Sequence, residues 1–252
     1  MNIRVVGLPG VPEVQAGDDL VSLTVGAVER AALTVEPGDV FVYAQKIVSK
    51  AEDRLVRLDS VVPSALAHEW GRTSGRDPRV IELVIQDARR VVRMDRGVLI
   101  VETAHGFICA NAGIDTSNIR PGWAARLPAD PDATARRICA GLRSAWRLSV
   151  GVIVADTFGR PWREGQMNVA IGAAGLRSVL DYRGRLDSHG QTLRSTAIAV
   201  ADELAAAGEL VMGKAGGIPI ALIQGAGAGD CGVDEGSVRT SLLRRPEEDL
   251  FR

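Results

Sequence analysis

The sequence predicts a globular fold in which helices and strands are mixed along the chain. An apolar, β-branched run at 150–154 leads through Asp156 and Thr157 into a turn rich in Gly, Pro and Arg. A second apolar run follows, so this segment predicts a strand, a turn and a short strand. Residues 131–148 carry apolar side chains at helical spacing and predict a helix. Three alternating runs predict an antiparallel meander, at residues 90–94, 98–102 and 106–110.

The amino-terminal part of the chain predicts two strands on either side of a capped helix. Residues 3–6 predict a strand, and Asp18 or Asp19 can cap a helix that follows. Turn-forming residues at 36–39 then lead into a predicted strand at 40–44.

The next segment, residues 45–52, permits either a strand or a helix. Lys46 and Lys50 are four positions apart, so a helix would place them on one face. Spacing alone favours a solvated surface position for both. Residues 63–73 and 78–89 predict two further helices, each opened by a proline.

The carboxyl-terminal third predicts a long alanine-rich helix that packs in a core or an interface. Gly213 is expected to end this helix. Gly225–Asp230 is rich in glycine but does not open a helix, which favours a flexible loop over a dinucleotide-binding motif. The predicted elements are a strand at 176–182, a turn at 183–184, the helix at 192–212 and a strand at 218–223.

Composition and charge exclude several classes of protein. The 252 residues are 46% hydrophobic and 24% charged, which is typical of a soluble globular protein. Arginine supplies nearly all the positive charge, and 30 basic against 31 acidic residues give no reason to expect nucleic-acid binding. The amino terminus lacks a signal-peptide pattern, and no apolar run approaches the roughly 20 residues of a membrane span. We therefore expect a cytoplasmic protein without a membrane partner.

The cysteines, histidines and glycines match no common cofactor motif. The three cysteines stand outside any CxxC pattern and predict reduced thiols without zinc. The three histidines form no HxxH or HExxH pattern. Residues 208–214 fit GxxxxGK, but Ala215 replaces the serine or threonine of a P-loop and the segment follows a helix. The glycine-rich run at 213–217 could still bring backbone N–H groups close to a phosphate. No repeat or composition shift divides the chain, so residues 1–252 are expected to form a single domain.

Two aspartates form the strongest chemical pattern. Asp115 and Asp156 each follow a predicted strand, and Asn118 and Thr157 stand beside them. Hard cations such as Mg²⁺ or Mn²⁺ take oxygen ligands, usually one or two carboxylates together with water and substrate phosphates. Aspartates in turns more often cap backbone N–H groups, so spacing alone leaves both interpretations open.

Five segments are shared, in this order, with one known family: AQKIVSKAEDRLV, ANAGIDTSNI, VIVADTFGRPWREGQMNVAIGAAG, LDYRGRLDSHGQTLRSTAIAVADELA and LVMGKAGGIPIALIQG. On these segments the chain resembles the coenzyme F-420-0:L-glutamate ligases over nearly its whole length. It looks like the stand-alone form, because the nitroreductase-like second domain of some members is missing.

The resemblance implies a fold, a reaction and a set of partners. The implied fold is α+β, with mixed and antiparallel sheets and flanking helices in two intertwined lobes, and the implied assembly is a homodimer. The implied reaction is GTP-dependent addition of L-glutamate to coenzyme F-420-0 through an acyl phosphate, with GDP and phosphate released and later glutamates joined by γ-linkages. Two ions of Mg²⁺ or Mn²⁺ are implied, with K⁺ as a further candidate.

The resemblance also assigns residues by position. Asp115 and Asp156 look like metal ligands and Thr157 like the holder of a second metal, while Lys50 resembles a phosphate-facing lysine. Lys46 keeps the solvated interpretation. The nucleotide-binding positions implied are Leu8, Pro9, Gly10, Val11, Gln45, Lys50, Asn118, Gly213, Lys214, Ala215, Gly216 and Gly217.

Two positions depart from the family pattern, and two other functions stay open. Gln45 stands where serine is expected and Asp53 where glycine is usual, which affects the detail of nucleotide contact. One alternative is a related GTP- and metal-dependent ligase that amidates another carboxylate-bearing phosphate ester. The other is a catalytically silent nucleotide-binding subunit, against which the charged groups argue because their desolvation is costly.

Overall fold

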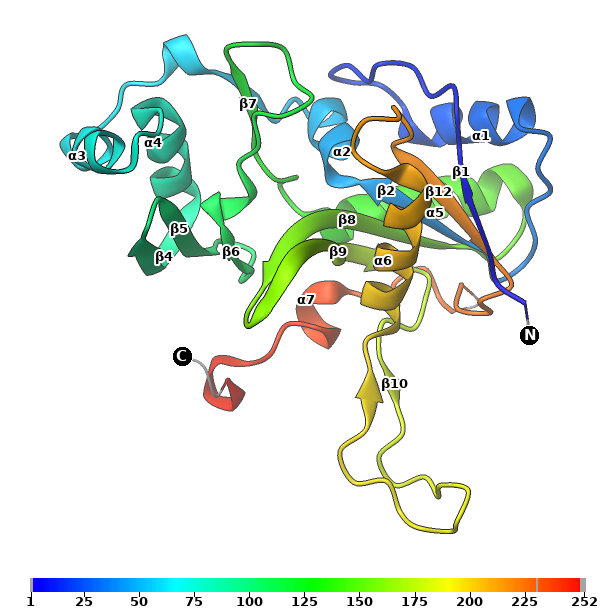
Figure 1. Cartoon of the computed structure of the whole chain (residues 1–252). Coiled ribbons are helices and arrows are strands. Elements are labelled where there is room, and N and C mark those ends of the chain that lie inside the picture. The colour runs from blue at the N-terminus through cyan, green and yellow to red at the C-terminus, as the bar shows by residue number, and fades with distance from the viewer. Residues whose placement is uncertain (1, 230, 250–252) are drawn as a thin grey trace.

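A five-stranded mixed sheet forms the centre of an α+β fold, in a computed structural model that describes residues 2–229 and 231–249 (Figure 1). Only the β2–β8 pair is parallel, and the other neighbours are antiparallel. The β-branched and apolar residues of its central strands are almost completely buried, which explains why these runs fold as strands. The strand order is β1 (Arg4–Gly7), β12 (Ile220–Gln224), β2 (Val40–Ala44), β8 (Gly151–Arg160) and β9 (Arg163–Ala174).

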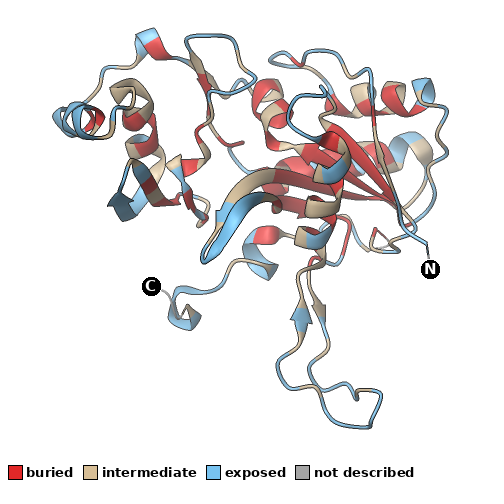
Figure 2. Ribbon diagram, viewed as in Figure 1, coloured by how far each residue is buried: buried red, intermediate tan, exposed pale blue. Residues whose placement is uncertain are grey.

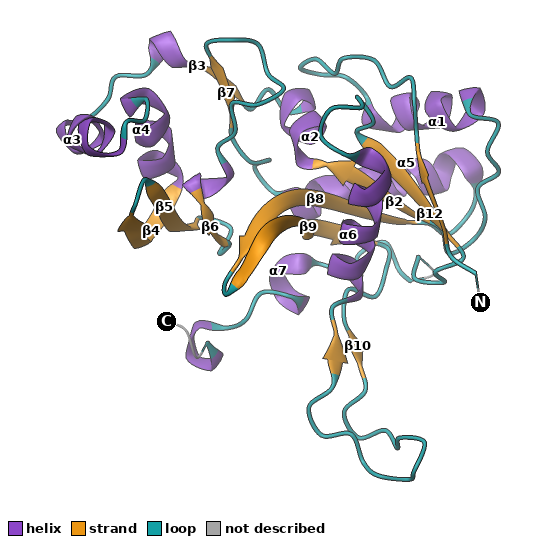
Figure 3. Ribbon diagram, in the orientation of Figure 1, coloured by secondary structure: helices purple, strands orange, loops and turns teal. Residues whose placement is uncertain are grey.

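Helices cover both faces of this sheet. Helix α5 (Pro131–Trp146) packs on β8 and β9 and contacts α1 (Leu20–Arg30), while α6 (Val200–Met212) crosses the opposite face (Figure 3). Gly172 on β9 permits the close approach of α5, because a Cβ there would lie 2.3 Å from the carbonyl carbon of Pro131. A short helix, α2 (Gln45–Ala51), continues directly from β2.

A smaller lobe, residues 53–126, has its own hydrophobic cluster, and both clusters are visible as buried segments in Figure 2. The chain enters this lobe from α2 and returns to the large sheet through α5. Its elements are β3 (Leu55–Arg57) paired with β7 (Trp123–Ala125), α3 (Ala65–Ser74), α4 (Pro78–Asp87), and the sheet of β4 (Ala88–Asp95), β5 (Val98–Thr103) and β6 (Ile108–Ala110).

An extended arm, residues 177–199, projects from the body of the molecule (Figure 1). Its two sides pair through β10 (Leu180–Asp181) and β11 (Ala197–Ile198). After β12 the chain forms α7 (Val238–Ser241), which Asp132 of α5 fixes by accepting hydrogen bonds from the backbone N–H groups of Val238 and Arg239. Among the residues that the structure describes, short 3₁₀ turns lie at Leu58–Ser60, Asn111–Gly113 and Pro246–Glu248.

Several predicted elements are confirmed. Asp19 caps α1 by accepting hydrogen bonds from two backbone N–H groups, and Pro78 opens α4. The meander forms as β4, β5 and β6, and Gly213 ends α6. Residues 45–51, which permitted either structure, form a helix.

Three predicted boundaries are wrong. The helix predicted at 192–212 begins only at Val200, because backbone groups of residues 193 and 196 pair with Arg185 and Tyr182 across the arm. Of the strand predicted at 176–182, only Leu180–Asp181 forms a strand. Pro63 does not open α3, since Ser64 is its N-cap.

A backbone hydrogen bond fixes part of the glycine-rich segment 225–230. Gly229 donates a backbone hydrogen bond to Gly38, while Asp230 lies outside the described residues. None of the helices in the described part of the chain combines the length and the apolar character needed to cross a membrane.

Candidate active site

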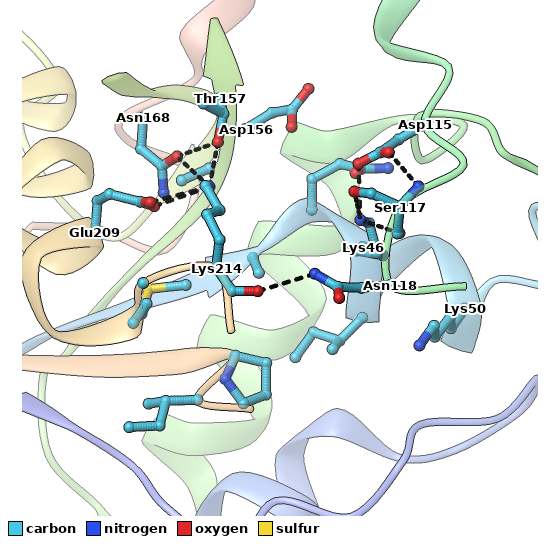
Figure 4. A pocket seen from close by; sticks show the side chains of 18 of the residues that line it. Lys46, Lys50, Asp115, Ser117, Asn118, Asp156, Thr157, Asn168, Glu209 and Lys214 are labelled. Atoms are coloured by element: carbon cyan, nitrogen blue, oxygen red, sulfur yellow. Dashed lines mark hydrogen bonds and ion pairs between the residues drawn. The ribbon is translucent and has the colours of Figure 1, made fainter. Parts of the chain in front are cut away.

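A cavity of about 940 Å³ opens where the parallel strands β2 and β8 stop pairing, between the two lobes (Figure 4). The last parallel pair is Ala44 with Ala155. Beyond it the β2 chain turns into α2, while β8 continues as a hairpin with β9 to Arg160. Asp156 and Thr157 therefore lie inside a long strand and not at its end. They face the cavity because their parallel neighbour has ended.

Asp115 reaches the cavity from the small lobe. It follows β6 and a short 3₁₀ turn, and its backbone pairs with Ala125. Its Oδ1 accepts a hydrogen bond of 2.7 Å from the Ser117 N–H, and its Oδ2 lies 2.7 Å from Lys46 Nζ. Burial alone would raise the pKa of Asp115, but the contacts with Lys46 and Ser117 hold this pKa below its ordinary value.

Asp156 lies in the same cavity, and its pKa is shifted in the opposite direction. Burial raises the pKa of its carboxyl group to about 6, and the nearby negative charge of Asp115 adds to the effect. Within the described residues no ion pair forms with Asp156, so the charge is compensated only by a backbone N–H and by more distant lysines. A cation beside Asp156 would supply the missing compensation.

The two carboxylates fit a hard divalent cation. In residues 2–229 and 231–249 no three or more His, Cys, Asp or Glu side chains are grouped so that they could hold a metal ion. Mg²⁺ is nevertheless often bound by only one or two carboxylates together with substrate phosphates. Asp115 and Asp156 match that donor set, with a cavity large enough for a phosphate-bearing substrate between them.

A second set of polar side chains surrounds Thr157 in this cavity. Its hydroxyl donates to Asn168 Oδ1 at 2.6 Å across the hairpin, and Lys214 Nζ lies 2.5 Å from the same hydroxyl oxygen. Glu209 pairs with Lys214 at 3.0 Å. Sequence reasoning missed Asn168 and Glu209. Asn168 could have been found from the hairpin register, which pairs it with Thr157. Glu209 could have been found from its position in the last turn of α6, next to Lys214.

Lys46 and Lys50 do not occupy the solvated surface that their spacing favoured. Helix α2 packs against β2 and β8 of the large sheet and against β7 of the small lobe. The helix face that carries Lys46 and Lys50 lines the cavity. Lys50 is buried and pairs with Glu13 at 2.5 Å, and the Lys46 side chain is only 17% exposed. Gln45 is also buried, where it donates to Ser49 Oγ and to the Arg126 carbonyl.

The predicted nucleotide-side residues are divided between the cavity and its surroundings. Leu8 is fully buried in the core and donates its N–H to the Ile220 carbonyl. The lining includes Asn118, whose amide donates to the Lys214 carbonyl at 3.0 Å. The cavity is lined by Val11, Gln45, Lys50, Asn118, Gly213, Lys214, Ala215 and Gly217, whereas Leu8, Pro9, Gly10 and Gly216 lie outside the lining.

Comparison with known proteins identifies the family. The model of F420-0:Gamma-glutamyl ligase matches residues 10–225. The coenzyme F420:L-glutamate ligase of Methanothermobacter thermautotrophicus is 42% identical over 253 residues, which cover 100% of both chains. Proteins of the same name from Methanopyrus kandleri and Methanocaldococcus jannaschii are 40% and 39% identical, over 99% and 88% of this chain and 98% and 88% of theirs. This chain therefore belongs to the F420-0:Gamma-glutamyl ligase family.

Proposed function

We propose that this protein joins L-glutamate to coenzyme F-420-0 in a GTP-dependent reaction and then adds further glutamates through γ-linkages. The observation that carries the proposal is the meeting of Asp115 and Asp156 in one lysine-lined cavity between the lobes. The curated relatives that match this chain along its whole length carry the name coenzyme F420:L-glutamate ligase.

The proposed chemistry has two steps. A carboxylate oxygen of the acceptor attacks the γ-phosphorus of GTP, which forms an acyl phosphate and releases GDP. The amine of glutamate then attacks the acyl carbon, which forms the amide, expels phosphate and releases a proton. Activation is needed because a free carboxylate is a poor electrophile, whereas phosphate is a good leaving group.

Specific residues would serve the first step. Lys50 and Lys214 can hold phosphate oxygens, since both ammonium groups face the cavity. Asp115 and Asp156 would hold one divalent cation, Mg²⁺ or Mn²⁺, and the oxygens around Thr157 a second. When bound, these ions would offset the negative charge that builds on the transferred phosphoryl group.

One assay tests the proposal directly. The purified protein is incubated with GTP, MnCl₂ or MgCl₂, L-glutamate and F-420-0, and the products are followed by mass spectrometry. We expect glutamylated F-420 and one GDP per glutamate added, and no product after EDTA treatment. GDP without a glutamylated acceptor would show that another carboxylate is the substrate, and the absence of both products would overturn the proposal.

We also propose that the arm at 177–199 joins two copies of the chain in a homodimer. The arm projects from the body (Figure 1), and it carries Leu186, which is 67% exposed. Burial of such a side chain in a partner would supply apolar contact area. Light scattering should give twice the chain mass of 26.7 kDa, and Leu186→Asp should shift the protein toward the monomer. A monomeric wild-type protein at high concentration contradicts the homodimer.

A further inference from the structure

The distribution of lysine in this protein is uneven. Of its 30 basic residues only three are lysines, and all three line the active-site cavity. Each one is paired with a carboxylate: Lys46 with Asp115, Lys50 with Glu13 and Lys214 with Glu209. The ammonium group is a compact point charge on a flexible stem, so it can exchange one partner for another more easily than the planar guanidinium of arginine. Lysine is therefore suited to a site whose partners change during a reaction.

Lys46 holds its ammonium group against Asp115 and Ser117. It lies in the first turn of α2, directly after β2 ends. Its Nζ contacts Asp115 Oδ2 at 2.7 Å, the Ser117 carbonyl at 2.5 Å and Ser117 Oγ at 3.1 Å. An ammonium group has three N–H donors, and these contacts use all of them.

These contacts place the ammonium group on the carboxylate that is proposed to bind a divalent cation. Asp115 Oδ1 is directed to the Ser117 N–H, while Oδ2 is directed to Lys46 (Figure 4). Two cations that share one carboxylate oxygen repel each other strongly in a partly buried site. A divalent cation at Asp115 and the present position of Lys46 Nζ therefore compete.

We propose that Lys46 is an internal cation that holds Asp115 until a divalent cation binds, and then remains beside the reacting anions as a positive charge. The second half of this inference rests on the proposed function. Ser117 offers two oxygens that can keep the displaced ammonium group close to the cavity. The acceptor carboxylate and the transferred phosphoryl group are both anionic, so a fixed positive charge beside them stabilises their approach.

The test compares two properties of Lys46→Met and Lys46→Arg. The first is Mn²⁺ affinity without GTP, measured by calorimetry, and the second is the single-turnover rate of glutamyl transfer at saturating Mn²⁺. For Lys46→Met we expect Mn²⁺ to bind about threefold more tightly or better, because a competing charge is gone. We expect transfer to slow by roughly 10- to 100-fold, because the charge beside the reactants is also gone.

Matched variants separate charge from structure. Lys46→Arg keeps the charge, so its Mn²⁺ affinity should stay near that of the wild type and its transfer rate should exceed that of Lys46→Met. Arg57→Met removes an exposed charge paired with Asp59, outside the cavity lining, and should change neither property. Thermal unfolding checks that each variant is folded, and Lys46→Gln replaces Lys46→Met if the latter does not fold.

The two measurements can each overturn the inference. Equal or weaker Mn²⁺ binding by Lys46→Met would show that Lys46 only positions Asp115. An unchanged transfer rate at saturating Mn²⁺ would remove Lys46 from the chemistry. If the wild type transfers no glutamate, the proposed function and the role of Lys46 in transfer both fail, whereas the Mn²⁺ comparison needs no acceptor and still decides whether Lys46 competes with the cation.

Discussion

The side-chain amide of Asn118 donates a hydrogen bond of 3.0 Å to the backbone carbonyl of Lys214, 96 positions later in the sequence. This bond joins the small lobe to the loop that follows α6, and both residues line the candidate active-site cavity. Asn118 has a φ of 49°, a left-handed conformation that asparagine tolerates better than most residues. The contact therefore fixes the position of one wall of the cavity relative to the other.

Asn118→Ala should weaken GTP binding while the protein stays folded. The substitution removes one neutral hydrogen bond, so we expect KM for GTP to rise by about three- to tenfold with little change in kcat. Steady-state kinetics with GTP as the varied substrate measures this, and Asn118→Asp, which retains the side-chain shape, is the comparison. An unchanged KM would show that the loop is held by other contacts.

Asp156→Asn should abolish turnover and make the metal-free protein more stable. The pKa of Asp156 is raised to about 6, so above that pH the folded state holds a charge that the unfolded chain accommodates more easily. Removal of this charge should stabilise the metal-free protein at pH 7.5 by about 1 to 3 kcal/mol. Urea unfolding in EDTA measures the stability, and the Mn²⁺-dependent assay measures turnover. Undiminished turnover at saturating metal would remove Asp156 from the site.

The stability of the metal-free wild type should depend on pH through the same group. Because the folded-state pKa of Asp156 lies above its ordinary value of 3.8, the folded protein binds the proton more tightly. The destabilising effect of the ionised Asp156 carboxylate on the folded state is absent below about pH 4 and complete above about pH 6. The difference in unfolding free energy between Asp156→Asn and the wild type should therefore shrink as the pH falls across this window. A constant difference contradicts the raised pKa.

Gly172→Ala should destabilise the fold. The added Cβ would lie 2.3 Å from the carbonyl carbon of Pro131, and backbone atoms at the start of α5 must move to relieve the clash. Overpacking of this kind costs about 1 to 3 kcal/mol. Gly159→Ala is a matched control on β8, because a Cβ there meets no heavy atom within 4 Å and should be close to neutral. Urea unfolding of both variants makes the comparison, and equal stability would show that α5 can shift without cost.

Local sequence signals predicted much of this fold. The cap at Asp19, the proline that opens α4 and the alternating strands of the meander all act through neighbouring residues, and the structure contains each of them. The helix predicted to begin at Thr192 failed for a nonlocal reason. Residues 193 and 196 form hydrogen bonds across the arm, and such pairing overrides helix propensity.

The site was predictable only where the chemistry of a residue type indicated it. The carboxylates of Asp115 and Asp156 suggested a cation site, and the structure places both in one cavity. Lys46 was missed because spacing along a helix does not reveal which face packs against a neighbour. Asn168 enters the site through its register opposite Thr157, which depends on where the hairpin turns.

The confinement of every lysine to one cavity has a practical consequence. Reagents that acylate primary amines can modify only these three side chains and the amino terminus, while the arginines elsewhere on the protein stay unmodified. Mass increments from such labelling therefore become a footprint of the cavity, and protection from labelling reports whether a ligand occupies it, without any engineered probe.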